Sequence, residues 1–239
     1  MMNWKQLISA KRFGMEEFHE ERQENRSEFQ RDYDRLIFSA PFRRLQNKTQ
    51  VFPLPGSVFV HNRLTHSLEV ASVGRSLGDD VAKALLERHP ELQDSFLPEI
   101  GSIVSAACLA HDLGNPPFGH SGEKAISTFF SEGKGVRLKE KQPNGEQLSP
   151  MEWEDLIHFE GNANAFRILT HQFEGRRKGG FVLTYTTLAS IVKYPFSSSL
   201  AGTKSKFGFF VSEEESFRKI ATELGLILLN EHPLKYARH

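Results

Sequence analysis

The chain of 239 residues is long enough to bury a core as one large domain or two small ones. Thirty basic residues balance thirty acidic ones, so no overall charge field favours nucleic acid, a membrane surface or an acidic partner. The single cysteine excludes an internal disulfide framework, and no apolar run is long enough for a signal-peptide core or a bilayer span. We therefore expect a cytoplasmic protein without membrane attachment.

The first quarter of the chain is mostly polar. Residues 1–35 form a charged N-terminal segment, in which the dense mixed charge of residues 15–35 predicts a solvated helix or a segment that docks late on the fold. Pro41 interrupts any continuous helix after it. The sequence PLPGS at 53–57 predicts a turn.

Two helices with apolar stripes are predicted next. The first starts at Asn62, and its apolar residues recur at three- and four-residue steps: Leu64, Leu68, Val70, Ala71, Val73, Leu77, Val81 and Leu85. The second starts near Pro98, and its buried side is expected to hold Ile100, Ile103, Val104, Ala107 and Cys108. His111 and Asp112 fall in its last turn, before Gly114 and the Pro116–Pro117 pair stop the helix.

The remaining elements are also predicted to be helical. One helix begins around Ser121, and another follows a capping box formed by Ser149 and Glu152. A further helix covers 159–173, and a last one is predicted to be capped by Ser212 with Glu215. Period-two alternation is nearly absent and no domain boundary is visible, so we expect one all-α domain over residues 1–239.

His66 in the helix that starts at Asn62, together with the His111–Asp112 pair at the end of the helix that starts near Pro98, suggests a metal site. Imidazole nitrogens and a carboxylate oxygen suit a divalent ion of the zinc, manganese, nickel or iron kind. His111 and Asp112 are adjacent and would diverge in mid-helix, but they can converge at a fraying C-terminal turn. His66 would be the third ligand.

Four segments in order resemble the HD-domain phosphohydrolases, and more narrowly the bacterial deoxyguanosine triphosphate triphosphohydrolases. They are RDYDRLIFSAPFRRLQNKTQVF, HNRLTHSLEV, LAHDLGNPPFGHSGEKA and FEGNANAFRIL, and the likeness spans roughly residues 26 to 196. The resemblance implies an HD-domain helical bundle. It also implies that His66, His111 and Asp112 bind a divalent metal ion: manganese, magnesium, nickel, cobalt or zinc.

The same resemblance implies a catalytic pair and a substrate pocket. His120 and Glu123 match the family's catalytic pair, and a spacing of three residues puts them on one face of a helix. The positions that match substrate contacts are Gln50 for the sugar, Arg63 for phosphate, and Asn162 and Lys193 in the pocket. The expected partner is a deoxynucleoside triphosphate.

Two departures from the family pattern qualify this prediction. Asn115 stands where many relatives have a histidine near the phosphates. In the family, a further aspartate well downstream completes the metal site, but this chain has no aspartate after IVKYP. We therefore expect a bundle that is incomplete at the C-terminus, in which the apolar stripe of Ile220, Leu224 and Ile227 lacks a partner, and whose activity is impaired.

The leading hypothesis is metal-dependent hydrolysis of a deoxynucleoside triphosphate to the deoxynucleoside and inorganic triphosphate. One alternative is another HD-superfamily phosphohydrolase, acting on a phosphomonoester or a signalling nucleotide. A second is a non-catalytic module that binds nucleotide or nucleic acid, which the basic loops at 176–178 and 204–206 favour. The resemblance also suggests a homo-oligomer in a full-length form, with single-stranded DNA or a nucleotide as an effector.

Overall fold

The computed structural model describes residues 2–17, 26–49, 62–140, 142, 145–175, 178–201, 206–229 and 235–238. Its α-helices are α1 Trp4–Leu7, α2 Glu28–Ile37, α3 Ala40–Arg44, α4 Arg63–Arg88, α5 Ile100–Ala110, α6 His120–Ser131, α7 Pro150–Ile157, α8 Gly161–Thr170, α9 Tyr185–Ile191 and α10 Glu214–Glu223. Short 3-10 turns connect several of them, among them η1 Leu45–Asn47, η3 Leu97–Glu99, η4 Lys134–Lys139 and η7 Val211–Glu213. Over these ranges the chain forms isolated β-bridges but no strand, which confirms the all-α prediction. None of the helices in them has both the length and the hydrophobicity needed to cross a bilayer.

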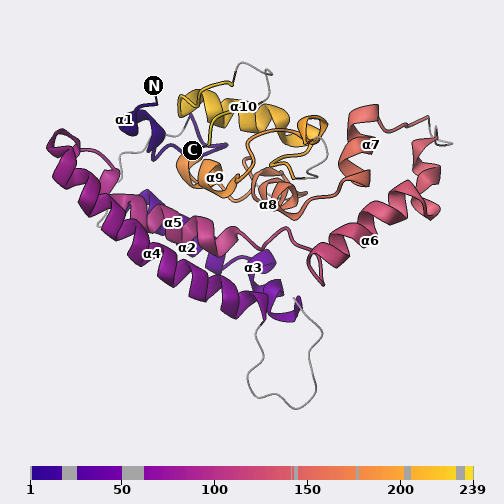
Figure 1. The fold of residues 1–239 in the computed structure, drawn as a ribbon, viewed down its shortest axis with the longest axis horizontal. Coiled ribbons are helices and arrows are strands. Elements are labelled where there is room, and N and C mark those ends of the chain that lie inside the picture. The colour runs from indigo at the N-terminus through magenta and orange to yellow at the C-terminus, as the bar shows by residue number, and fades with distance from the viewer. Residues whose placement is uncertain are drawn as a thin grey trace, which may run out of the picture.

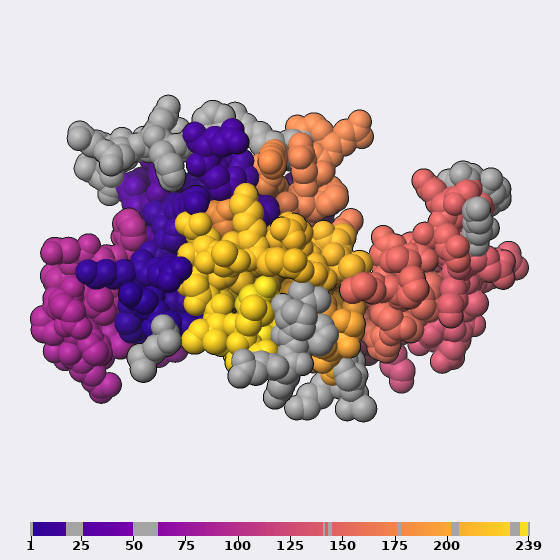
Figure 2. All heavy atoms as spheres, turned by 90° about the horizontal axis from the view of Figure 1, so that it is seen from above, coloured from indigo at the N-terminus to yellow at the C-terminus, as the bar shows by residue number. Residues whose placement is uncertain are grey.

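The helices form a body with a projecting arm. In Figure 1, α4 lies along the outer edge of the body with α5 beside it, and α8, α9 and α10 lie on the other side of α5. Helices α6 and α7 pack against each other and extend away from this body, and the view in Figure 2 shows the same projection. The turn from α5 to α6 therefore lies where the arm joins the body.

Small residues let α4 and α5 approach closely. A β-carbon on Gly78 would stand 2.8 Å from the Cα of Gly101, and one on Gly74 would stand 2.8 Å from the Sγ of Cys108. The predicted stripe of α4 therefore divides in two. Ala71 is buried and Leu64, Leu68 and Leu85 pack against the core, whereas Val73, Leu77 and Val81 are 59%, 60% and 50% exposed. The periodicity shows which residues share a face of α4, but only part of that face is covered, because small residues form the contact with α5.

The charged N-terminal segment docks on the body through α2. Phe29, Asp32 and Leu36 of α2 are fully buried. Arg12 donates from Nη1 to Asp32 Oδ1 at 2.7 Å and to the Val182 carbonyl at 2.7 Å. This buried network joins the N-terminal residues to the start of α9. The turn predicted at 53–57 lies outside the described residues.

One of the two capping predictions is confirmed. Ser149 accepts from the Glu152 amide at 3.2 Å, and Glu152 accepts in return from the Ser149 amide at 2.8 Å. The prediction for the last helix was wrong. Helix α10 begins after a 3-10 turn, its N-cap makes no side-chain cap bond, and the Ser212 hydroxyl instead bonds to Glu213 and Arg167.

The expected uncovered stripe near the C-terminus is largely buried. Ile220 and Leu224 are 0% exposed and belong to the main core cluster, while Ile227 is 42% exposed. Helix α10 packs against α9, and this contact covers the part of the stripe that was expected to lack a partner.

Candidate metal and catalytic site

The start of α4 places the first metal-ligand candidate. The Asn62 side chain accepts a hydrogen bond from the Thr65 amide at 2.9 Å, which caps the helix. His66 follows within the first turn and is half-buried. The cap thus fixes the direction in which α4 begins, and with it the position of this imidazole.

The end of α5 supplies the other two candidates. The helix ends at Ala110, and the chain turns tightly through a hydrogen bond of 3.1 Å from the Leu113 amide to the Ala110 carbonyl. One ligand atom each of His66, His111 and Asp112 lies within 4.8 Å of the others. The three predicted ligands therefore meet, and they do so just beyond the last residue of α5.

Hydrogen bonds orient this cluster. His111 Nδ1 lies 2.6 Å from the Cys108 carbonyl and donates to it, which leaves Nε2, 3.5 Å from Asp112 Oδ1, as the ring nitrogen that can bind a metal. Asn115 donates to the same Oδ1 at 2.6 Å, while Arg63 donates to Oδ2 at 2.8 Å. An imidazole nitrogen beside a carboxylate oxygen is a fitting donor set for a divalent transition metal. The cluster fits the metal that the sequence predicted.

A tight turn connects the metal-ligand candidates to α6. A β-carbon on Gly114 would stand 2.1 Å from the Ala165 amide nitrogen of α8, so only glycine allows this approach. Phe118 and Gly119 adopt left-handed conformations with φ of 65° and 56°. A β-carbon on Gly119 would stand 3.3 Å from Nη2 of Arg63. The guanidinium of Arg63 therefore spans from Asp112 to the residue before α6.

The predicted catalytic pair forms at the start of α6. His120 Nδ1 lies 2.8 Å from Glu123 Oε2, and the two side chains are 86% and 12% exposed. Burial alone would raise the pKa of Glu123, but hydrogen bonds from His120 and the Gly161 amide and the charge of Lys206 outweigh it and lower the pKa. Glu123 is thus a carboxylate at neutral pH, and His120 presents Nε2 to solvent.

The four predicted substrate residues differ in their exposure and in the contacts that they make. Gln50 lies outside the described residues. Arg63 is 3% exposed and is engaged with Asp112 rather than facing solvent. The Asn162 side chain donates to Glu160 at 2.7 Å. Lys193 is exposed, with its Nζ 5.5 Å from the ring centre of Tyr194.

Two lysines that the sequence did not assign to the metal and catalytic residues lie at this site. Lys48 donates to the Leu113 carbonyl at 3.1 Å, and burial together with the charge of Arg63 lowers its pKa. It belongs to the segment KTQVF, so its position within a family motif was the available signal. Lys206 lies 3.5 Å from Glu123 Oε2. The sequence marked it only as part of the basic loop 204–206, because the contact with Glu123 is made by the tertiary fold.

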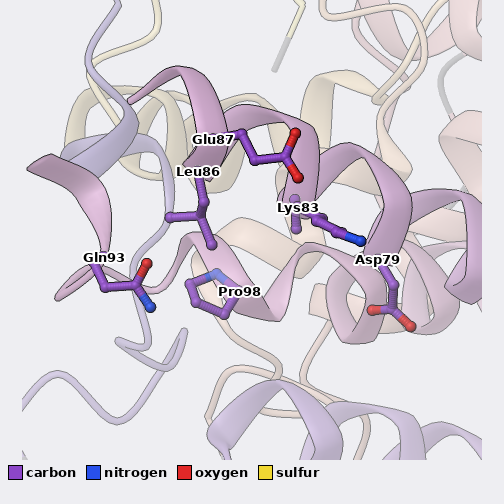
Figure 3. A pocket seen from close by; sticks show the side chains of 7 residues that line it. Asp79, Lys83, Leu86, Glu87, Gln93 and Pro98 are labelled. Carbon is purple, nitrogen blue, oxygen red and sulfur yellow. The ribbon is translucent and has the colours of Figure 1, made fainter. Parts of the chain in front are cut away.

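The hollow shown in Figure 3 is a separate feature. It measures about 390 Å³ and is lined by Asp79, Ala82, Lys83, Leu86, Glu87, Gln93 and Pro98. Lys83 is seventeen residues beyond His66 on the same helix, which corresponds to roughly 25 Å along its axis. Among the described residues, its lining contains no imidazole or thiol, and the hollow does not belong to the metal cluster.

Comparisons with known proteins show which families and relatives the chain resembles. Residues 63–178 match the HD domain family. The deoxyguanosinetriphosphate triphosphohydrolase-like protein of Synechocystis sp. is 44% identical over 247 residues, covering 100% of this chain and 55% of the relative. Its namesake in Pseudomonas aeruginosa is 45% identical, with 100% and 52% covered. The deoxyguanosinetriphosphate triphosphohydrolase of Yersinia enterocolitica is 36% identical, with 98% and 51% covered. The chain spans about half the length of the curated relatives it matches.

Proposed function

This chain belongs to the HD-domain family. We propose that it catalyses the metal-dependent hydrolysis of a deoxynucleoside triphosphate to the deoxynucleoside and inorganic triphosphate. The names of its relatives support this substrate class. The observation that carries the proposal is the His66–His111–Asp112 cluster, joined by one tight turn to the His120–Glu123 pair.

Each group has a distinct role in this proposal. His66, His111 and Asp112 would hold a divalent cation, which when bound polarises the α-phosphate and lowers the pKa of a coordinated water. His120 moves a proton through Nε2, because its Nδ1 is engaged by the Glu123 carboxylate.

The substrate is held by charge and hydrogen bonding. We propose that Lys193 binds phosphate, since its ammonium is exposed and stands over an aromatic ring rather than in a buried pair. Arg63 fixes Asp112 in the cluster, and we propose that the same guanidinium meets a phosphate group bound beside Asp112. Gln50 and Asn162 remain the proposed sugar and pocket contacts.

The test is to incubate the protein with each deoxynucleoside triphosphate and Mn²⁺ and to identify the products by phosphorus NMR. We expect intact triphosphate. His120→Ala should lower turnover by ~10²–10⁴-fold with unchanged metal content, because a positioned acid or base is typically worth that much. His111→Ala should lose both metal and turnover. His158→Ala is the matched control, since this half-exposed imidazole pairs only with Glu154 on α7 in the described structure.

Other results would favour one of the two alternative functions or change the proposed mechanism. Release of single phosphates would favour another HD-superfamily phosphohydrolase. Nucleotide binding without turnover, in a protein with bound metal, would favour the non-catalytic module. Full turnover by His120→Ala would remove this residue from the mechanism.

A further inference from the structure

The carboxylate of Glu123 receives three donors from three separate parts of the chain. His120 Nδ1 lies 2.8 Å from Oε2 within α6. The Gly161 amide, the first residue of α8, donates to Oε1 at 2.9 Å. Lys206, in the segment before η7, places Nζ 3.5 Å from Oε2. Only one of these contacts follows from helical spacing, and the other two are made by the fold.

A second carboxylate, that of Glu160, holds Lys206 in place. Its Nζ donates to Glu160 Oε1 at 2.8 Å, and Glu160 is 1% exposed. Glu160 also caps α8 by accepting from the amides of Asn162 at 2.6 Å and Ala163 at 3.2 Å. Burial would lower the pKa of Lys206, but the hydrogen bond and charge of Glu160 outweigh it and raise the pKa. Lys206 is therefore a fixed positive charge beside Glu123.

The approach of α8 to Glu123 depends on a glycine. A β-carbon on Gly161 would stand 2.9 Å from Glu123 Oε1 and 2.0 Å from Asn115 Oδ1. Any larger residue would push the amide away from the carboxylate. The junction of α6 and α8 is thus built around the side chain that orients His120.

We propose that Lys206 is a positioning residue for the His120–Glu123 pair. Together with the Gly161 amide, it keeps Glu123 an ionised, immobile acceptor, so that the neutral imidazole of His120 carries its proton on Nδ1 and presents Nε2. In the described chain, Glu160 lies behind Lys206 and the guanidinium of Arg63 lies beside Gly119, the residue before His120. The value of this tautomer for catalysis rests on the proposed function, whereas the orientation of the pair does not.

The experiment follows the pair directly by NMR in the 239-residue chain without added metal. Nitrogen-15 shifts of His120 report the tautomer at high pH, and the carboxyl carbon of Glu123 reports its titration. In Lys206→Met we expect the pKa of Glu123 to rise by about one unit, the lower end of the effect of a nearby opposite charge, because Lys206 is 30% exposed. The Nδ1–H tautomer should also lose its dominance, because Glu123, which stays ionised at high pH, is then no longer held in a fixed position beside His120. Lys206→Arg should restore both readings.

Lys219→Met is the matched control. Lys219 also ion-pairs with a glutamate, Glu16 at 2.6 Å, but it lies on α10 away from the pair, so both readings should stay unchanged. Unaltered Glu123 titration and His120 tautomer in Lys206→Met would overturn the proposal. So would equal changes in Lys206→Met and Lys206→Arg, which would indicate loosening of the junction instead of a lost charge.

A contact with substrate phosphate is a separate outcome. If Lys206→Met weakens the binding of inorganic triphosphate while the Glu123 titration is unchanged, Lys206 serves the ligand and the proposal is overturned. Because these readings need no turnover, an inactive chain would contradict the proposed function and leave the positioning role standing.

Discussion

Replacing Arg63 with methionine should destabilise the metal-free protein and make its stability depend more strongly on metal. Arg63 and Asp112 form a buried pair with side chains 4% and 6% exposed and an N–O distance of 2.8 Å. Methionine preserves much of the volume of arginine and removes the charge. The carboxylate of Asp112 would then remain buried without its main counter-charge.

The magnitude follows from the burial of this pair. Removing one partner of a buried ion pair costs about 3–5 kcal/mol. The lower end applies here, because Asn115 still donates to Asp112 and Lys48 lies close enough to interact with both residues. For a domain of this size, about 3 kcal/mol corresponds to a fall in Tm of roughly 6–12 °C.

Urea unfolding with and without saturating Mn²⁺ measures the effect. We expect the cation to take the place of the guanidinium beside Asp112, so that Mn²⁺ stabilises Arg63→Met more than it stabilises the original protein. Asp112→Asn combined with Arg63→Met should remove most of the cost, since no buried charge is left. Arg218→Met, which breaks a half-exposed pair with Glu214, should cost less than about 1 kcal/mol. An Arg63→Met protein as stable as the original without metal would refute the reasoning.

Two further predictions concern acid stability and association. Burial would raise the pKa of Glu16, but hydrogen bonds from Lys219 and Tyr185 lower it from 4.5 to about 2. The ionised Glu16 therefore contributes its full stabilisation above its pKa in the unfolded chain, about 4.5, and this contribution is lost as the pH falls towards 2. In Glu16→Gln, the free energy of unfolding in urea should depend less on pH over this range. An unchanged pH dependence would contradict the assignment. The exposed stripe on α4, Val73, Leu77 and Val81, should promote self-association, so Leu77→Asp should lower the mass measured by sedimentation. Phe38 is 73% exposed but does not belong to this stripe, so Phe38→Asp should leave that mass unchanged. A monomeric original chain would exclude an associating role for this stripe.

Local signals in the chain predicted much of the fold. The Ser149 capping box depends on residues three apart, and its hydrogen bonds form as expected. The start of α4 at Asn62 and the His120–Glu123 pair depend on the same short range. The meeting of His66 with His111 came from the family resemblance, which carries the tertiary arrangement with it.

The exposed stripe of α4 shows where local rules fail. Periodicity identifies residues that share a helix face, but it does not say which face has a partner. Gly74 and Gly78 carry no apolar side chain, yet they form the contact with α5 because they let two helices approach closely. Leu77 satisfies the pattern and lies in solvent.

Residue types and short spacings along the chain were sufficient to predict an all-α fold, and together with the family resemblance they predicted three metal-ligand candidates and a His-Glu pair. They were insufficient to predict that Lys206 and the Gly161 amide would hold Glu123 in place, or that Arg63 would be buried against Asp112. Those contacts join segments far apart in sequence, and they exist only because helix packing brings a charge and its counter-charge together. Long-range electrostatic pairing is decided by that packing, since no local hydrogen bond or periodicity encodes it.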